Sequence, residues 1–173
     1  MKFPLKSLLV LLVLALPALC QPLVYRPHTE ELYLLQVSGA INISSGNITA
    51  PDWIEVTVAE VKPFRTYKEF TYNLKTKATD KYRIGKVTIQ LGIQTYEFLI
   101  VQAGKVKVEV DGDSVTTQLS AIRKAWFVPD EGQPILPSLT YKVVGSSTQF
   151  NLKPQPGWLY IETATQVYCA KLQ

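Results

Sequence analysis

Short runs in which apolar and polar residues alternate recur along most of the chain. In the run 54–58, isoleucine and valine hold the even positions, while glutamate and threonine hold the odd ones. A period of two places successive side chains on opposite faces of an extended strand, so each run predicts a β-strand with one buried and one wet face. Four further runs have this period: 69–74, 87–91, 105–110 and 149–153.

Turn-forming residues separate the predicted strands. Asp111-Gly112, between two valine-containing runs, predicts a tight hairpin, and the apolar run Tyr96–Val101 predicts a central strand buried on both faces. Prolines break the segments 132–138 and 153–157, which predicts loops there. We expect no long helix, only a short helical turn near 119–124. The fold class that follows is all-β, either an antiparallel β-sandwich or a flattened barrel.

The first twenty residues differ from the rest of the chain. Two lysines precede an uncharged leucine-rich run, and a proline and a small residue lead to Cys20, which is the pattern of a secretory signal peptide. The run is shorter than the roughly 20 residues of a membrane span. We therefore predict a signal peptide over 1–20, a single secreted, extracellular β-rich domain over 21–173 and no transmembrane segment. A membrane anchor, or a lipid attached to Cys20, is the alternative.

Removal of the signal peptide also changes the charge of the protein. The formal net charge of +4 falls to +2 because Lys2 and Lys6 leave and no acidic residue leaves with them. A net charge this small says little about binding partners.

Two sequons, Asn42-Ile43-Ser44 and Asn47-Ile48-Thr49, lie in a stretch rich in glycine, serine and asparagine, residues 38–50, which predicts an exposed loop. With a secretory signal, we expect N-glycosylation of Asn42, Asn47 or both in a host that has the pathway. Cleavage would leave Cys169 as the only cysteine, so no intrachain disulfide can form. An odd cysteine in a secreted chain is either a buried or capped thiol or the link of a disulfide-bonded oligomer.

Side chains that support catalysis or metal binding are sparse. The single histidine, His28, lies between a proline and a threonine, and nothing around it or Cys169 indicates a nucleophilic site. Asp111 and Asp113 flank a glycine, which fits a partial calcium loop or, as the flanking strands favour, a hairpin turn. We expect no enzyme, no catalytic residue, no metal site and no cofactor. Two carboxylates acting as acid and base are the remaining catalytic alternative.

The strongest charge asymmetry is a basic stretch over 62–86, where eight basic residues face two acidic ones and aromatic residues are interleaved. In a secreted chain such a stretch could bind a sulfated glycan, an acidic matrix polymer or an anionic membrane, and nucleic acid is not an expected partner. The alternative is two solvated strand faces whose aromatic residues point inward. The candidate polyanion-binding residues are Lys62, Arg65, Lys68, Lys75, Lys77, Lys81, Arg83 and Lys86.

The second half of the chain has a recognisable order of strands. The runs 87–91 and 96–100 precede Gly104–Val115, which contains the pattern Val-x-Val-Asp-Gly-x-x-Val, and Gly157–Thr163 follows later. In this order, residues 86–173 resemble the second half of a von Willebrand factor type D domain, as found in vitellogenin-like lipoproteins and mucins. The resemblance implies an extracellular, non-catalytic β-sandwich module used in assembly or carriage. The cysteine framework and calcium motif of that family are absent, so no site residue is carried over.

These features favour a secreted, non-catalytic structural protein of the extracellular matrix, such as a component of a shell, skeleton, egg coat or mucus. The alternative is a soluble secreted binding protein for lipid or acidic glycan, including a venom or salivary factor. A lipid carrier needs a cavity of at least about 300 Å³, so the size of any cavity separates the two hypotheses.

Overall fold

A computed structural model describes residues 23–131 and 139–173, and these form two compact units. The described part of the N-terminal unit comprises residues 23–78 and 84–101, and that of the C-terminal unit comprises 79–83 and 102–173 without the gap. All regular structure in the described residues is β-strand, which confirms the predicted all-β class. The predicted signal peptide and the predicted loop at 132–138 lie outside the described residues.

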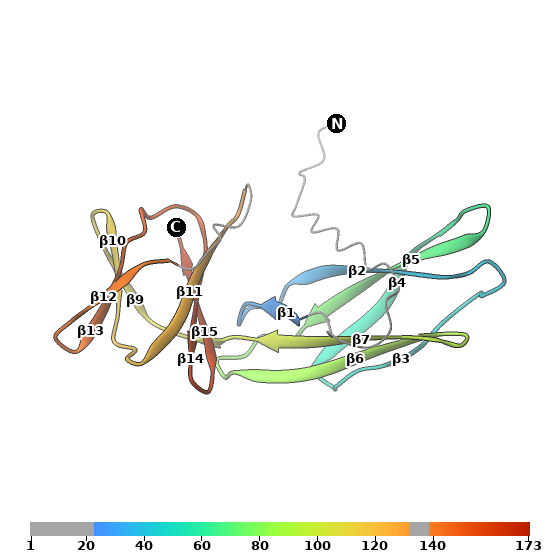
Figure 1. Cartoon of the computed structure of the whole chain (residues 1–173), viewed down its shortest axis with the longest axis horizontal. Coiled ribbons are helices and arrows are strands. Elements are labelled where there is room, and N and C mark those ends of the chain that lie inside the picture. The colour runs from blue at the N-terminus through green and yellow to red at the C-terminus, as the bar shows by residue number, and fades with distance from the viewer. Residues whose placement is uncertain (1–22, 132–138) are drawn as a thin grey trace. The chain divides into compact units, whose positions relative to one another are not determined.

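The N-terminal unit is a sandwich of two sheets (Figure 1). One sheet has the order β1-β7-β6-β3 and the other the order β2-β5-β4. Alternate residues of these strands point into one core, which includes Val37, Phe70, Tyr72, Ile89 and Ile100. The strands are β1 (Leu23–Arg26), β2 (Leu32–Ala40), β3 (Asn47–Thr49), β4 (Ile54–Pro63), β5 (Tyr67–Thr76), β6 (Arg83–Leu91) and β7 (Gln94–Gln102).

The C-terminal unit is also a two-sheet sandwich, with sheet orders β12-β13-β10-β9 and β11-β14-β15-β8. Its separate core includes Val115, Phe127, Phe150, Leu159 and Ile161. Neighbouring strands in these two sheets pair antiparallel, except for β15 and β8, which run parallel. The strands are β8 (Gly104–Lys105), β9 (Val108–Asp111), β10 (Ser114–Thr117), β11 (Ile122–Pro129), β12 (Tyr141–Val144), β13 (Ser147–Phe150), β14 (Gly157–Thr163) and β15 (Val167–Leu172).

The two units share one strand order. If β9 to β15 are lettered A to G, the sheets of the C-terminal unit read A-B-E-D and C-F-G, which is the arrangement of an immunoglobulin-type sandwich. Lettering β2 to β7 as B to G gives the N-terminal unit sheets B-E-D and C-F-G. In each unit one extra strand, β1 or β8, lies beside strand G. Sequence analysis expected one domain over 21–173, whereas the described residues form two units with separate cores.

Most local expectations from the sequence are confirmed. Asp111 pairs with Ser114 across a tight hairpin whose Gly112 has φ +54°, a left-handed conformation that glycine adopts without strain. The run Tyr96–Val101 falls in β7, which is a central strand as predicted, but it is not buried on both faces, because Glu97 and Leu99 are only half-buried. The segment 153–157 is a loop up to the start of β14.

Two local expectations are wrong. No helical turn forms near 119–124, because Ala121 takes the left-handed φ of 54° and the extended strand β11 begins at Ile122. The exposed loop expected over 38–50 is shorter, since β2 continues to Ala40 and β3 begins at Asn47. Ser38 and Gly39 lie in β2, whereas Ser44, Ser45 and Gly46 remain in the loop 41–46.

Candidate functional site

The basic stretch 62–86 is divided between the two units. Lys81 and Arg83 belong to the C-terminal unit, while the other six candidates belong to the N-terminal unit. Within the latter, Lys68 lies near one end of β5 and Lys75 near its other end. A strand rises about 3.3 Å per residue, which separates these two positions by roughly 23 Å.

Carboxylates neutralise three of the eight basic side chains. All three ion pairs are at least partly exposed, and such pairs contribute little to stability, but each reduces the local positive charge. Glu30 also accepts a hydrogen bond that raises the pKa of Lys75 above its usual value. The pairs are Lys62 with Glu60 at 3.1 Å, Lys75 with Glu30 at 2.6 Å and Lys86 with Glu97 at 2.7 Å.

Two further basic side chains have structural hydrogen bonds. The Nζ of Lys68 donates to the carbonyl oxygen of Ile43 at 2.9 Å and thereby ties the 41–46 loop to β5. The Nε of Arg83 donates to the Oε1 of Gln102 at 2.9 Å. Lys68 and Arg83 therefore stabilise the local chain conformation through these hydrogen bonds.

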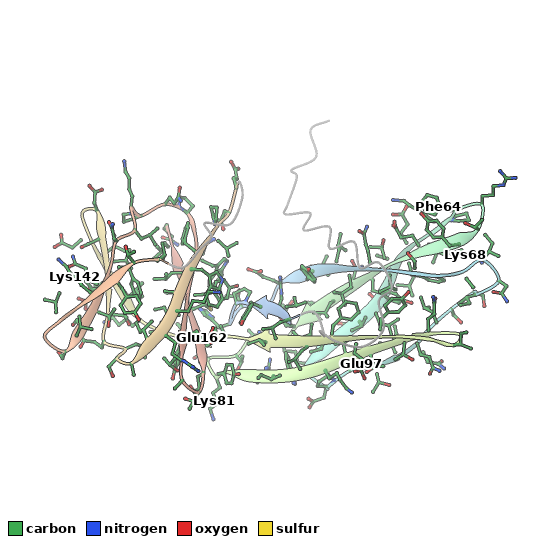
Figure 2. All side chains as sticks on the ribbon, in the orientation of Figure 1. Phe64, Lys68, Lys81, Glu97, Lys142 and Glu162 are labelled. Carbon is green, nitrogen blue, oxygen red and sulfur yellow. The ribbon has the colours of Figure 1, made fainter. Side chains whose placement is uncertain are left out.

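An aromatic pair marks the tip of the β4–β5 hairpin. Phe64 and Tyr67 stack with ring centroids 4.6 Å apart, and both side chains are exposed. Figure 2 shows Phe64 and Lys68 near this tip. Arg65 lies between the two aromatic residues and is exposed. The predicted inward position of the interleaved aromatics holds for Phe70 and Tyr72, which are fully buried, but not for this pair.

Both sequon asparagines are exposed in the N-terminal unit. Asn42 lies in the turn that follows β2, and Asn47 is the first residue of β3. β3 forms one edge of its sheet and pairs only with β6. The structure therefore exposes both predicted modification sites, Asn42 in a turn and Asn47 on an edge strand.

Cys169 is fully buried in β15 of the C-terminal unit. It lies opposite Tyr160 on one side and opposite Lys105 on the other. A thiol without exposed surface cannot reach a second chain unless the strand opens. This position favours the buried-thiol alternative over a disulfide-linked oligomer.

The residues considered for catalysis or calcium binding are not gathered into one site. In the described part of the chain, no three His, Cys, Asp or Glu side chains are grouped so that they could hold a metal ion. The Oγ of Ser114 donates to the backbone oxygen of Asp111 at 2.9 Å, which is the geometry of a closed hairpin turn. The carbonyl of Asp111 is thus used within the turn.

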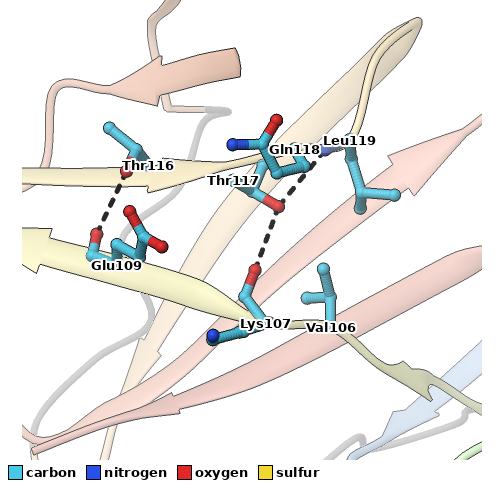
Figure 3. Close-up of a pocket in the computed structure, with 7 residues that line it drawn as sticks. All are labelled: Val106, Lys107, Glu109, Thr116, Thr117, Gln118 and Leu119. Carbon is cyan, nitrogen blue, oxygen red and sulfur yellow. Dashed lines mark hydrogen bonds between the residues drawn. The ribbon is translucent and has the colours of Figure 1, made fainter. Parts of the chain in front are cut away.

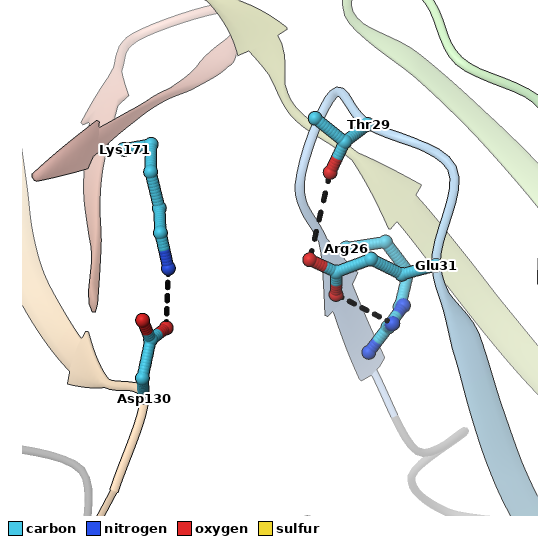
Figure 4. Close-up of polar contacts among 5 residues, drawn as sticks. All are labelled: Arg26, Thr29, Glu31, Asp130 and Lys171. Atoms are coloured by element: carbon cyan, nitrogen blue, oxygen red, sulfur yellow. Dashed lines mark hydrogen bonds and ion pairs between the residues drawn. The ribbon is translucent and has the colours of Figure 1, made fainter. Parts of the chain in front are cut away.

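Sequence analysis did not identify a polar cluster around Arg26. The guanidinium of this largely buried residue forms an ion pair with Glu31 at 3.1 Å, and Thr29 also hydrogen-bonds to Glu31 at 3.5 Å (Figure 4). The guanidinium carbon lies 4.8 Å from the ring centre of Tyr33. Burial raises the pKa of Tyr33, and the charge of Arg26 opposes that rise. This cluster fixes the connection between β1 and β2.

One sheet of the C-terminal unit has aromatic side chains on its face away from the core. Trp126 and Tyr160 stack with ring centroids 5.2 Å apart and an interplanar angle of 3°. The Nζ of Lys124 lies 5.5 Å from the Trp126 ring centre, a cation–π contact. Trp126 and Tyr160 are both buried, so their rings do not form an open binding platform. Period-two spacing at 124, 126 and 158, 160 is the signal that could have placed these residues on one face.

A second cation–π contact lies near the end of the same sheet. The Nζ of Lys171 lies 5.3 Å from the ring centre of Trp158 and also forms an ion pair with Asp130 (Figure 4). Lys171 is directly opposite Trp158 in the pairing of β14 with β15. The contact links three strands, because Asp130 follows β11.

A small pocket of about 200 Å³ opens beside β9 and β10 (Figure 3). The Oγ1 of Thr117 donates to the carbonyl of Lys107 at 3.2 Å and closes one side of it. This volume lies below the roughly 300 Å³ at the low end of ligand pockets. The lining residues are Val106, Lys107, Glu109, Thr116, Thr117, Gln118 and Leu119.

Comparisons with known proteins find no matching family model and no matching curated relative. Among solved structures, the I9–I11 tandem of titin is similar with 10% identity and a TM-score of 0.30, over 88% of this chain and 63% of that one. An endo-fucoidan hydrolase of glycoside hydrolase family 107 matches with 13% identity and a TM-score of 0.29, over 87% of this chain and 27% of that one. The titin domains Z1Z2 in complex with telethonin match with 7% identity and a TM-score of 0.31, over 87% and 92%.

The chain thus spans less than two thirds of the length of the first two matched structures. Superpositions at these TM-scores do not establish a family. Among the residues described, no helix is long and apolar enough to cross a membrane.

Proposed function

We propose that this chain is a secreted, non-catalytic structural protein of the extracellular matrix. The observation that carries the proposal is the arrangement of two successive sandwiches with the same immunoglobulin-type strand order. Such units present sheet faces, edges and loop ends rather than a deep cleft. Their cores are built from side chains that have no chemistry of their own.

The distribution of charge supports the same proposal. The basic side chains that could have formed a polyanion site lie in two units, and three of them are paired with carboxylates. The pocket beside β9 is smaller than the cavity that a lipid carrier needs. The soluble binding protein is therefore the weaker of the two hypotheses.

Location and mass of the native protein test this proposal together. Cells or tissue that produce the chain are separated into medium, detergent-soluble material and detergent-resistant extracellular material, and each fraction is probed with an antibody to the C-terminal unit. We expect the protein in the detergent-resistant extracellular fraction, with Gln21 at its N-terminus. An intracellular protein that retains residues 1–20 would contradict secretion. A protein found only in free fluid would contradict the structural role and point to the soluble binding protein.

A further inference from the structure

The strand β3 occupies an unusual position because it carries a sequon on an open sheet edge. Asn47, Ile48 and Thr49 pair with β6 in antiparallel register, and no strand of the described residues lies on the other side. An edge strand offers unpaired backbone donors and acceptors to any other extended chain. Proteins normally protect such edges by keeping them very short, or with charges, prolines, bulges or a covering element.

The side chains of β3 divide between the two faces of the sheet. Ile48 packs against the core, whereas Asn47 and Thr49 are exposed. Within the described residues, the side chains of Asn47 and Thr49 make no hydrogen bond. The acceptor amide of the sequon and its hydroxyl are therefore both accessible and have no role in holding the fold.

The second sequon lies in a turn that one backbone and one side-chain hydrogen bond hold in place. The N–H of Ile43 donates to the carbonyl of Ala40 at 3.1 Å, and its own carbonyl accepts from Lys68. Asn42 lies between these anchored residues, and its side chain is exposed. A modification at Asn42 would project from a defined turn without displacing a core residue.

The C-terminal unit shows how the same edge is protected elsewhere in this chain. Strand β11 takes the position in its sheet that β3 takes in the N-terminal unit. It carries exposed Arg123 and Lys124, a register shift between Ile122 and Lys124, and Pro129 at its end. β3 carries no charge, proline or register shift, and its short length of three residues is the one protective feature it has.

We propose that Asn42 and Asn47 carry N-linked glycans and that the glycan on Asn47 covers the open edge of β3. This inference rests on the secretion part of the proposed function. In the reaction, the amide nitrogen of the asparagine side chain attacks C1 of a lipid-linked oligosaccharide. An N–C1 bond forms, the amide loses one proton, and the bond from C1 to the lipid phosphate breaks as that group leaves. The bulky, hydrated product excludes a second strand from the edge.

Glycan occupancy is tested with paired substitutions at the hydroxyl position of each sequon. The full chain is expressed in a eukaryotic secretory host, and the mass of the secreted protein is measured before and after treatment with peptide:N-glycosidase. We expect Thr49→Ser and Ser44→Thr to keep the glycans, because both retain the sequon, and Thr49→Ala and Ser44→Ala to lose one glycan each. A secreted protein with no excess mass at either site overturns the proposal.

A second arm separates glycosylation from the native signal. The chain 21–173 is expressed behind a secretory leader of the host. If this protein is glycosylated at both sites while the full chain with residues 1–20 stays inside the cell, secretion by the native leader fails and the glycan proposal stands. If both proteins are secreted without glycans, secretion stands and the glycan proposal fails.

The role at the sheet edge has its own readout. Sedimentation of the glycosylated protein is compared with that of the doubly substituted Ser44→Ala/Thr49→Ala protein over a wide range of concentrations. We expect self-association to tighten by roughly tenfold or more when the glycans are absent, as the edge becomes open to pairing. The Ser44→Thr/Thr49→Ser protein is the matched control and should remain monomeric. Identical sedimentation of all three proteins would show that the glycans do not guard the edge.

Discussion

Gly157 is the position where a single added methyl group tests the packing of the C-terminal unit most directly. It begins β14 and lies opposite Pro129 of β11. A Cβ atom built at this glycine would lie 2.5 Å from the carbonyl oxygen of Val128 and 2.8 Å from the Cα of Pro129, and it would also overlap the ring of Phe127. Real Cβ atoms essentially never approach other heavy atoms closer than 3.0 Å.

The size of the effect follows from which atoms are in the way. Overpacking a core costs about 1–3 kcal/mol when side chains can shift. At Gly157 two of the three nearest atoms belong to the backbone of β11, so the cost of Gly157→Ala belongs at the upper end of that range. The alanine also restricts the unfolded chain, and this offsets about 0.4–1 kcal/mol of the packing cost. We expect a net loss of about 2 kcal/mol in the free energy of unfolding.

Gly112→Ala is the matched control, because its added Cβ meets no atom within 4 Å but the residue has φ +54°. This control isolates the conformational cost, which is about 1–2 kcal/mol for a non-glycine residue in the left-handed region. Urea unfolding gives both free energies, and hydrogen exchange assigns each loss to particular strands. For Gly157→Ala we expect lost protection in β11 and β14. A loss below about 0.5 kcal/mol, within the range of an ordinary surface substitution, would refute the packing described here.

Further measurements address the tyrosines, the cysteine and the basic stretch. The buried hydroxyl of Tyr72 has no hydrogen-bond partner among the described residues, so Tyr72→Phe should leave the urea stability unchanged or raise it by up to about 1 kcal/mol. Tyr96→Phe removes a hydrogen bond to the carbonyl of Ser38 and should lower the stability by about 1 kcal/mol. Burial raises the pKa of both tyrosines in the folded state, so their hydroxyl protons leave the unfolded chain at a lower pH than they leave the folded protein. Thermal melts should therefore show a stability that is constant below pH about 10 and declines above it. A thiol reagent should label Cys169 only after denaturation, and labelling of the folded protein would contradict its burial. The dispersal of the basic stretch 62–86 predicts no retention on heparin at physiological ionic strength, and retention there would restore the polyanion hypothesis.

The strands were accessible to sequence analysis because period-two alternation reports which face of a strand is buried. It does not report which core that face belongs to. The runs that contain Leu74 and Phe150 have the same pattern, yet they lie in different units. Two cores therefore look like one in the sequence. The left-handed φ of Ala121, which excludes the expected helical turn, likewise has no signal in the local sequence.

The charge pattern of the basic stretch shows the same limit of a sequence window. Its lysines are close together in the sequence, but two of the three carboxylates that pair with them are not. Glu30 reaches Lys75 because Leu32 is opposite Lys75 in the pairing of β2 with β5. Glu97 reaches Lys86 because β7 lies beside β6. Strand pairing places Glu30 and Glu97 beside lysines that are 45 and 11 residues away in the chain. A charge count along the sequence carries no information on which strands pair.

The two units share a strand order although no repeat is visible in the sequence. Strands β6 and β14 hold the same position, and each contributes alternate buried residues, Ile89 in one and Leu159 and Ile161 in the other. The fold constrains the spacing and the apolar character of these side chains but not their identity. Outward positions are constrained less, so the equivalent edge strands β3 and β11 can differ. β3 carries a sequon, whereas β11 carries charges and a register shift. Differences between equivalent outward positions are therefore where the separate roles of the two units are to be sought.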